Sequence, residues 1–260
     1  MTSSPNVGSV SSLIQGSSAL GPGAASVLTG DLGAVVIAGA AGLDTEDIQA
    51  SEVTLVTLLV DASSSIASRG LEDAVRRGQN ELLDAFAAAR EKDSILVALW
   101  TFSDDVNVHH AYVPVDDATR LGQRNYAGLG GTRLYDTWLD ALAANVAYAE
   151  RLRASGTPTR SIVVVVTDGE DCGSRRRVAD CARVSKDLRA SEQFQLAFVG
   201  VGDDVDFEDV ARRMGIPDGS IAVAKAATPQ TMRQLFRMVS QSAIRASQRM
   251  VGGGGGFFGP

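Results

Sequence analysis

The sequence predicts an α/β protein built on a doubly wound, Rossmann-like sheet. This sheet is expected to be mostly parallel, with one antiparallel edge strand and helices on both faces. From residue 51 onward, apolar runs of strand length alternate with segments whose apolar residues recur every three or four positions. The runs at 53–60 and 162–166 are apolar at nearly every position, as in strands buried on both faces. In such open sheets, ligands bind beyond the carboxyl ends of the strands.

The first fifty residues differ in composition from the rest of the chain. Residues 1–27 are rich in Ser, Gly and Ala and lack periodicity, so we expect a flexible arm. The stretch LGAVVIAGAAGL, within residues 28–48, has two interpretations. It is either a short strand and turn that docks on the main domain, or an exposed apolar segment that a partner covers. The predicted division is a flexible segment at 1–50, a domain at 51–249 and a glycine-rich tail at 250–260.

The first half of the domain is predicted to begin with a strand at 53–60 and a helix at 69–92. One apolar stripe at helical spacing marks that helix, formed by Leu71, Val75, Gly78, Leu82 and Phe86. A second apolar strand follows at 95–102. Alternating apolar positions at 106–112 predict a half-buried edge strand that pairs back as a hairpin, and a short helix is expected at 116–121.

The second half of the domain repeats this alternation. A glycine-rich loop at 128–132 opens a helix with an apolar side formed by Leu134, Trp138, Leu142, Val146 and Ala149. The five residues at 162–166 are all aliphatic, which is the strongest strand signal in the chain. The elements expected after this strand are a helix at 175–190, a strand at 194–201, a helix at 206–214, a strand at 221–223 and a helix at 228–248.

Composition and charge exclude some classes of protein. The net charge of −7 argues against a nucleic-acid binder, which would carry a basic face. No stretch reaches the roughly 18 apolar residues of a membrane helix, and no secretory signal is apparent, so we expect no membrane span and a cytoplasmic location. Cys172 and Cys181 are too few for a disulfide framework. A single bridge between them remains an alternative, although bridges are rare in reducing compartments.

Five short oxygen-bearing side chains fall at the predicted carboxyl edge. Asp61 ends the first strand and is followed by Ser63 and Ser65; Thr132 lies after the glycine loop, and Asp168 follows the strand of valines. A buried aspartate is costly without a compensating charge or hydrogen-bond donors. Hard divalent cations take oxygen ligands, so Mg²⁺ is the expected ion, with Mn²⁺ or Ca²⁺ as alternatives. Two carboxylates balance its charge, and one position is left for an outside oxygen.

These residues resemble the pattern of the von Willebrand factor A (VWA) domain family with a metal-ion-dependent adhesion site (MIDAS). The pattern is D-x-S-x-S, then a distant Thr, then a distant Asp. In this chain it is carried by DASSS at 61–65, GGTRLYD around Thr132 and TDGED around Asp168. The segment WTFSD at 100–104 also resembles the second strand of the family and its turn. The resemblance extends over about residues 52–248.

The resemblance implies metal-dependent protein binding and no catalysis. Ser63, Ser65 and Thr132 would contact the ion directly or through water, and the two aspartates would act through water or hydrogen bonds. An Asp or Glu of a partner protein would complete the coordination. The resemblance to bacterial-type intracellular members further implies an adaptor that works with an AAA+ ATPase or in a stress or defence system.

Simpler roles for the same residues stay open. Asp61 or Thr132 could cap a helix, and Asp168-Gly169 is a common turn. The acidic residues Glu170, Asp171, Asp203 and Asp204 are expected as loop charges, although the last two could line the binding face. Residues 175–177 are all arginines, and they could be solvent-exposed residues at the start of a helix or could bind an acidic residue of a partner. His109 and His110 should point to opposite faces of their strand, which argues against a shared metal. Phe257 and Phe258 are either a docking tip or a frayed end.

Two other functions compete with the interaction module. The first is a metal-dependent phosphohydrolase with Asp61 as nucleophile, as in phosphatases of the haloacid dehalogenase type. Those enzymes need a second aspartate two residues later, where this chain has Ser63, and a lysine for which no candidate is placed. No Ser-His-Asp set is apparent either. The second is a non-catalytic scaffold in which the metal only stabilises the loops.

Overall fold

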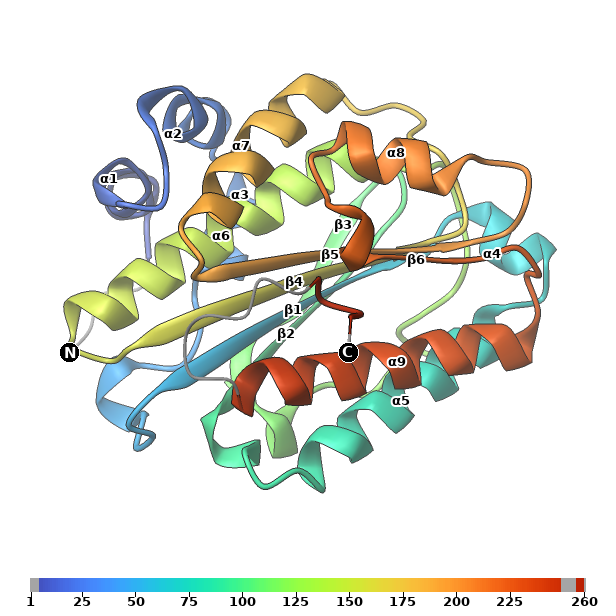
Figure 1. Cartoon of the computed structure of the whole chain (residues 1–260), viewed down its shortest axis with the longest axis horizontal. Helices are drawn as coiled ribbons and strands as arrows, with labels where there is room; N and C mark the ends of the chain where they lie inside the picture. Colours follow the sequence, from blue (N-terminus) through green and yellow to red (C-terminus); the bar gives the residue numbers. More distant parts are fainter. Residues whose placement is uncertain (1–4, 249–255, 260) are drawn as a thin grey trace.

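The computed structural model describes residues 5–248 and 256–259 of the chain. Its centre is a six-stranded sheet with the strand order β3-β2-β1-β4-β5-β6 (Figure 1). Strands β2 and β3 pair antiparallel, and every other neighbouring pair is parallel. The strands are β1 (Val53–Asp61), β2 (Ile95–Phe102), β3 (Val106–Pro114), β4 (Thr159–Thr167), β5 (Phe194–Val201) and β6 (Ile221–Ala224). The predicted doubly wound α/β sheet with an antiparallel edge strand is confirmed.

Helices cover both faces of the sheet (Figure 1). On one face lie α6 (Leu134–Ala154), α7 (Val178–Ala190) and α8 (Phe207–Arg213); on the other lie α5 (Glu72–Ala87) and α9 (Pro229–Gln248). Successive side chains of a strand point to opposite faces, so β1 serves two cores. Leu55 and Leu59 pack on the first face, and Val56 and Leu58 on the second. This burial on both faces explains the apolar runs in the sequence.

The helix predicted at 69–92 is the shorter helix α5 in the structure, and a short helix that was not predicted precedes it. A short helix, α4 (Ser64–Ser68), directly follows Asp61, and α5 begins only at Glu72. Gly70, between them, has a φ of +65°, a left-handed conformation that ends α4 and that glycine adopts at no steric cost. All five residues of the predicted stripe are buried. The helix predicted at 116–121 is a single 3₁₀ turn, η3 (Val115–Asp117).

The flexible arm predicted at 1–27 is wrong for the described residues. Residues 7–39 form three helices, α1 (Val7–Gly16), α2 (Pro22–Thr29) and α3 (Ala34–Gly39). Asn6 and Ser9 form a capping box at the start of α1, and Pro22 occupies the first turn of α2, where a missing N–H costs nothing. These helices bury a few large residues against α6 and α7. Those few residues are too widely spaced among Ser, Gly and Ala to give a visible stripe.

The apolar stretch around α3 docks on the domain as a helix, so the predicted strand is wrong and the predicted docking is right. Gly39 lies so close to Trp100 that a Cβ there would come within 2.1 Å of the indole ring. A Cβ at Gly42 would come within 2.4 Å of the Tyr148 ring. The small residues of this stretch therefore allow backbone to lie directly on aromatic side chains. No helix within residues 5–248 is long and apolar enough to cross a membrane.

Two smaller expectations concern the cysteines and the tail. Cys172 is exposed and Cys181 is buried, and both are free thiols. Of the predicted tail, residues 250–255 and 260 lie outside the described part of the chain. Phe257, by contrast, is buried and belongs to the core on the α5 and α9 face. Phe257 is therefore not a frayed end, and the segment docks on its own chain.

Candidate metal centre

The pairing of β1 with β4 brings the two predicted aspartates to one edge of the sheet. Val60 pairs with Val166 in parallel register, so Asp61 at the end of β1 lies level with Thr167 at the end of β4. Asp168 follows immediately. Each aspartate is only 1% exposed. Two carboxylates are therefore buried at the carboxyl edge, where open α/β sheets bind ligands.

Asp61 is fixed by hydrogen bonds to both carboxylate oxygens. Its Oδ1 accepts from the backbone N–H of Ser63 at 2.7 Å, and its Oδ2 accepts from the Thr167 hydroxyl at 2.5 Å. The Tyr126 hydroxyl donates to the carbonyl oxygen of Asp61 at 2.5 Å. Burial raises the pKa of Asp61 to about 6, although the bonds from Thr167 and Ser63 act in the opposite direction. A cation at this edge would favour the charged carboxylate.

The two serines link Asp61 to Asp168. The Ser63 and Ser65 hydroxyls lie 2.9 Å apart, and Ser65 donates to Oδ1 of Asp168 at 2.7 Å. The second oxygen of Asp168 is buried without a hydrogen-bond partner among the described residues. Its closest cationic neighbour is Arg69, whose Nε lies 3.7 Å away. Burial raises the pKa of Asp168, while the Ser65 hydrogen bond and the Arg69 guanidinium lower it. An unpartnered buried carboxylate oxygen is suited to a bound cation.

The glycine-rich loop brings Thr132 to the same place. A Cβ built on Gly169 would lie 3.1 Å from the Thr132 hydroxyl oxygen and 3.8 Å from that of Ser65, so both hydroxyls face Gly169. Thr132 also forms an isolated bridge with Cys172, whose N–H donates to its carbonyl oxygen at 2.7 Å. The capping interpretation of Thr132 is wrong, because Arg133 occupies the N-cap position of α6. All five predicted oxygen side chains meet at one edge.

The loop is held against α4 at several points. The N–H of Leu129 donates to the Ala62 carbonyl at 2.8 Å, and the N–H of Ser64 donates to the Gly130 carbonyl at 3.0 Å. A Cβ on Gly128 would come within 2.7 Å of the Ser63 carbonyl oxygen, so this residue has no room for a side chain. The loop therefore lies directly on the backbone of the D-x-S-x-S segment and sets the distance between Thr132 and the serines.

The donor set fits a hard divalent cation. Two carboxylates and three hydroxyls converge, and none of the five is a soft or nitrogen ligand. Within residues 5–248 and 256–259, no group of three or more His, Cys, Asp or Glu side chains offers an alternative metal site. His109 and His110 make separate hydrogen bonds, to the Thr101 hydroxyl and to the Ala111 carbonyl.

The family model of the von Willebrand factor type A domain matches residues 56–238. The chain belongs to this family. The matched region contains all five residues of the site. No curated protein gives a significant match.

Solved structures share the fold of this VWA domain. Proximal thread matrix protein 1 of the mussel byssus is 16% identical with a TM-score of 0.51, over 74% of this chain and 46% of that one. The PilB minor pilin of Streptococcus sanguinis is 13% identical with a TM-score of 0.53, over 79% and 64%. The pilus adhesin SpaC of Lactobacillus rhamnosus GG is 16% identical with a TM-score of 0.52, over 75% and 30%. The chain thus spans less than two thirds of each of these proteins.

Several charged residues around the site have structural partners. Arg69 bridges Asp168 and Asp204, with an Nη2 to Oδ2 distance of 2.6 Å to the latter. Asp171 accepts from the Tyr135 N–H at 3.1 Å and so provides a hydrogen-bond partner for a backbone N–H in the first turn of α6. Arg176 pairs with two acidic residues of α6, which anchors the loop after β4. Glu170, Arg175, Arg177 and Asp203 are exposed.

Three residues that hold the site were not predicted from the sequence: Arg69, Tyr126 and Thr167. The contact of Thr167 with Asp61 depends on the register between β1 and β4, which no local pattern encodes. The contacts of Tyr126 and Arg69 depend on where two loops return to the sheet edge. The sequence signal for Thr167 is its position directly before Asp168 at the end of the strand, which marks it as a neighbour of the site.

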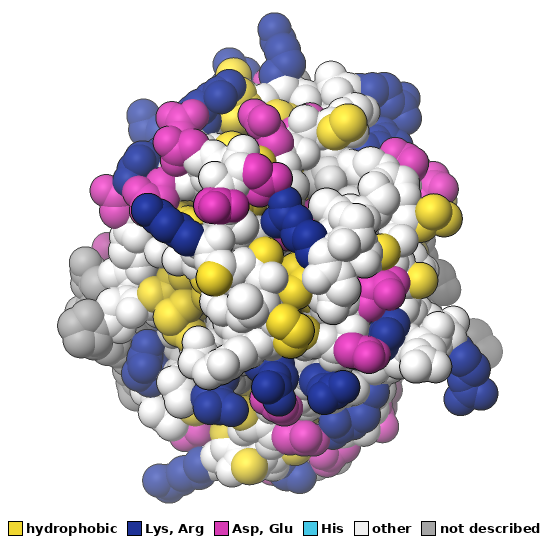
Figure 2. All heavy atoms as spheres, turned by 90° about the vertical axis from the view of Figure 1, so that its right-hand side faces the viewer, with side chains coloured by type: hydrophobic (Ala, Val, Ile, Leu, Met, Phe, Trp, Pro, Cys, Tyr) yellow, Lys and Arg dark blue, Asp and Glu magenta, His cyan; other side chains and the backbone are white. Residues whose placement is uncertain are grey.

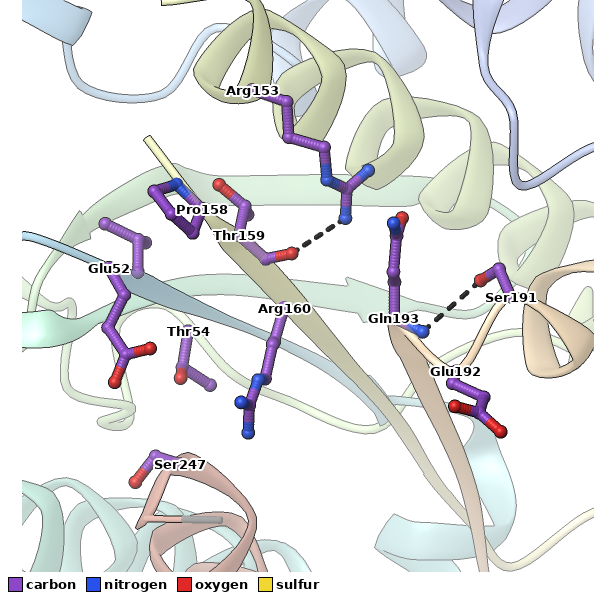
Figure 3. A pocket seen from close by; sticks show the side chains of 11 residues that line it. Glu52, Thr54, Arg153, Pro158, Thr159, Arg160, Ser191, Glu192, Gln193 and Ser247 are labelled. Atoms are coloured by element: carbon purple, nitrogen blue, oxygen red, sulfur yellow. Dashed lines mark hydrogen bonds between the residues drawn. The ribbon is translucent and has the colours of Figure 1, made fainter. Parts of the chain in front are cut away.

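The surroundings of the VWA site are mixed in chemistry. Figure 2 views the carboxyl edge, where hydrophobic, basic and acidic side chains are interspersed and neither charge dominates. One cavity of about 490 Å³ lies elsewhere, at the amino ends of β1, β4 and β5 (Figure 3). There Arg153 donates to the Thr159 carbonyl at 2.8 Å, and the Gln193 N–H donates to the Ser191 hydroxyl at 3.3 Å. Because it lies at the opposite edge, this cavity is separate from the five oxygen side chains.

Proposed function

We propose that the chain is a metal-dependent protein-interaction module. In this proposal Asp61, Ser63, Ser65, Thr132 and Asp168 hold one divalent cation, preferably Mg²⁺, with Mn²⁺ or Ca²⁺ as alternatives. The observation that carries the proposal is the hydrogen-bonded series from Ser63 through Ser65 to Asp168, which ends in a buried carboxylate oxygen without a hydrogen-bond partner among the described residues. One solved structure of the mussel protein has a zinc-occupied MIDAS motif, which supports a metal at this position of the fold.

The role of the protein residues is to orient oxygens and to limit charge. Asp61 and Asp168 together carry two negative charges, which balance one divalent cation, and the hydroxyls add ligands without further charge. A bound cation would supply Lewis-acid affinity for an outside oxygen. An Asp or Glu carboxylate of a partner protein is the proposed occupant, because its oxygen is a hard ligand that can fill the remaining coordination position of the cation.

The setting of this interaction follows the resemblance of the sequence. We propose an adaptor in the cytoplasm that works with an AAA+ ATPase or in a stress or defence system. The VWA family membership supports an interaction module. The similar structures include a byssus protein, a minor pilin and a pilus adhesin, so a location outside the cell is the alternative to be tested.

The geometry does not favour the phosphohydrolase. A nucleophilic aspartate needs an oxygen that can reach a phosphorus atom. Both oxygens of Asp61 are engaged as acceptors from Ser63 and Thr167, and the residue is buried. Ser63 also occupies the place where those phosphatases need a second aspartate.

Calorimetric titration of the full chain with MgCl₂ or MnCl₂ tests the metal site. We expect one binding site, which Asp61→Ala and Ser63→Ala abolish because each removes an oxygen at the centre of the site. Ser64→Ala is the matched control, since its side chain is exposed between the two serines of the motif. Undiminished binding in both Asp61→Ala and Ser63→Ala would contradict the assignment.

Affinity capture with and without metal tests the interaction. A partner should be retained by the immobilised chain in MgCl₂ and released by EDTA. Asp168→Ala should lose the partner while circular dichroism shows an unchanged fold. Equal capture in magnesium and in EDTA would refute a metal-dependent interface.

A further inference from the structure

The segment Gly256-Phe257-Phe258-Gly259 is bound to the domain like a peptide ligand. In Figure 1 it lies between β6 and α9, close to the turn that precedes β6. This turn is η4 (Asp218–Ser220). Phe257 is only 5% exposed and joins the core between the sheet and the pair α5 and α9. Phe258 stacks edge-on against it, with 4.9 Å between the ring centroids.

Backbone hydrogen bonds fix the register of this segment on η4. The N–H of Phe257 donates to the Ser220 hydroxyl at 3.0 Å, and the N–H of Phe258 donates to the Gly219 carbonyl at 2.9 Å. From α9, the Arg245 guanidinium reaches the Gly259 carbonyl at 3.5 Å. The segment is therefore held by directional contacts as well as by burial of its aromatic rings.

The contact between Gly256 and Gly219 adds sequence selectivity. A Cβ on Gly256 would lie 2.2 Å from the Gly219 carbonyl carbon, and a Cβ on Gly219 would lie 2.9 Å from Gly256 Cα. The two backbones touch, so neither residue can carry a side chain without moving the segment away. The glycine contact favours glycine at position 256, and the burial of the Phe257 ring favours a large apolar residue after it.

We propose that η4, the start of β6 and the last turns of α9 form a recognition site for a Gly-Phe-Phe-Gly segment, and that a second copy of this chain can supply that segment. Each copy carries both the site and its ligand, so the contact can form within one chain or between two. Within one chain, docking is favoured because the segment is held at an effective concentration of about millimolar. Between chains, the contact is head-to-tail, because segment and site are different surfaces.

This contact leaves the proposed metal edge free. The turn η4 precedes β6 and lies at its amino end, whereas the five oxygen side chains lie at the carboxyl edge of the sheet. The inference therefore does not depend on whether a metal binds.

The first test uses a fluorescent peptide, Gly-Gly-Phe-Phe-Gly-Pro, and the full-length double variant Phe257→Ala/Phe258→Ala. Titration up to about millimolar concentration, followed by anisotropy, should give saturable binding, because the site is emptied of its own rings. The wild-type chain should bind at least about tenfold more weakly, since its own segment competes. A Gly-Gly-Ala-Ala-Gly-Pro peptide is the matched control. The absence of saturable binding to a folded double variant would overturn the recognition site.

The second test separates the two halves of the contact. Gly219→Val keeps the segment but blocks the site, and Phe257→Ala/Phe258→Ala keeps the site but lacks the rings. Each variant alone should sediment as a monomer, and their mixture should form a heterodimer at about millimolar concentration. Circular dichroism confirms that both variants are folded. Ser220→Ala, added to the double variant, removes one hydrogen-bond acceptor from the site and is a milder change that should weaken the heterodimer. A mixture that stays monomeric would overturn the role of a second copy.

Discussion

Asp61 keeps its position because neighbouring residues donate to both of its carboxylate oxygens. One donor comes from the next turn of the chain, Ser63, and the other from the adjacent strand, Thr167. The local donor follows from the D-x-S motif itself, since an aspartate commonly accepts from the backbone two residues later. The distant donor exists only because β1 and β4 pair in one particular register. A buried carboxylate is thus tolerated through contacts of two different origins.

Replacing Thr167 with valine should destabilise the fold. The substitution preserves shape but leaves one buried oxygen of Asp61 without its donor, which typically costs about 1–3 kcal/mol. Urea denaturation in EDTA, followed by circular dichroism, would measure the loss in the free energy of unfolding. Thr167→Ser is the control, since it keeps the hydroxyl. Equal stability of the two variants would show that this hydrogen bond contributes nothing.

The five site residues could be predicted because their spacing and strand ends are visible in the sequence. Asp61, Ser63 and Ser65 form a compact motif, and Asp168 follows five aliphatic residues and a threonine. Their supporting residues could not be predicted in the same way. Tyr126, for example, lies in a loop without a pattern, and only the folded chain brings its hydroxyl to the Asp61 carbonyl.

At the scale of elements, the site depends on how closely a loop approaches a short helix. The loop at 128–132 and helix α4 are in backbone contact, and this contact places Thr132 beside the two serines. The sequence predicted the loop but not α4, because five residues are too few to show a helical period. The helix predicted at 69–92 is too long at both ends for a related reason: its apolar stripe runs correctly from Leu71 to Phe86, but the stripe does not mark where the helix starts and ends.

Gly128→Ala should weaken metal binding. The new Cβ would lie 2.7 Å from the Ser63 carbonyl oxygen and 2.8 Å from the Ala67 nitrogen, both backbone atoms that cannot turn away. The loop must then shift and carry Thr132 with it. We expect the dissociation constant for Mg²⁺ to rise about tenfold or more, equivalent to about 1.4 kcal/mol.

Gly122→Ala, outside the loop, is the matched control for a glycine-to-alanine change, because its Cβ would meet only the Asn125 side chain at 3.9 Å. Calorimetry on both variants should show a loss of affinity confined to Gly128→Ala. Wild-type affinity in Gly128→Ala would mean that the loop does not set the position of Thr132.

At the scale of the whole molecule, the N-terminal helices extend the domain beyond the region that resembles the family. The family match begins at residue 56, yet α1, α2 and α3 pack on α6 and α7 and share one core with them. Their sequence could not predict this, because small residues carry no periodic signal and only become informative when a neighbouring surface is known. These helices lie on the face of the sheet that α6 and α7 cover (Figure 1).

If the N-terminal helices are part of the same cooperative unit, Leu28→Ala should lower the stability of the entire domain. Leu28 is 0% exposed in the core that joins α2 to α6 and α7, and truncation of a buried leucine typically costs about 2–5 kcal/mol. Val7→Ala is the control, because Val7 is 53% exposed. Urea unfolding followed in parallel by far-ultraviolet circular dichroism and by the fluorescence of Trp100 and Trp138 should shift as one transition. Two separated transitions in Leu28→Ala, the earlier one reported by Trp100 beneath Gly39, would mean that residues 5–42 unfold separately, and that the predicted boundary near residue 50 divides two independent units.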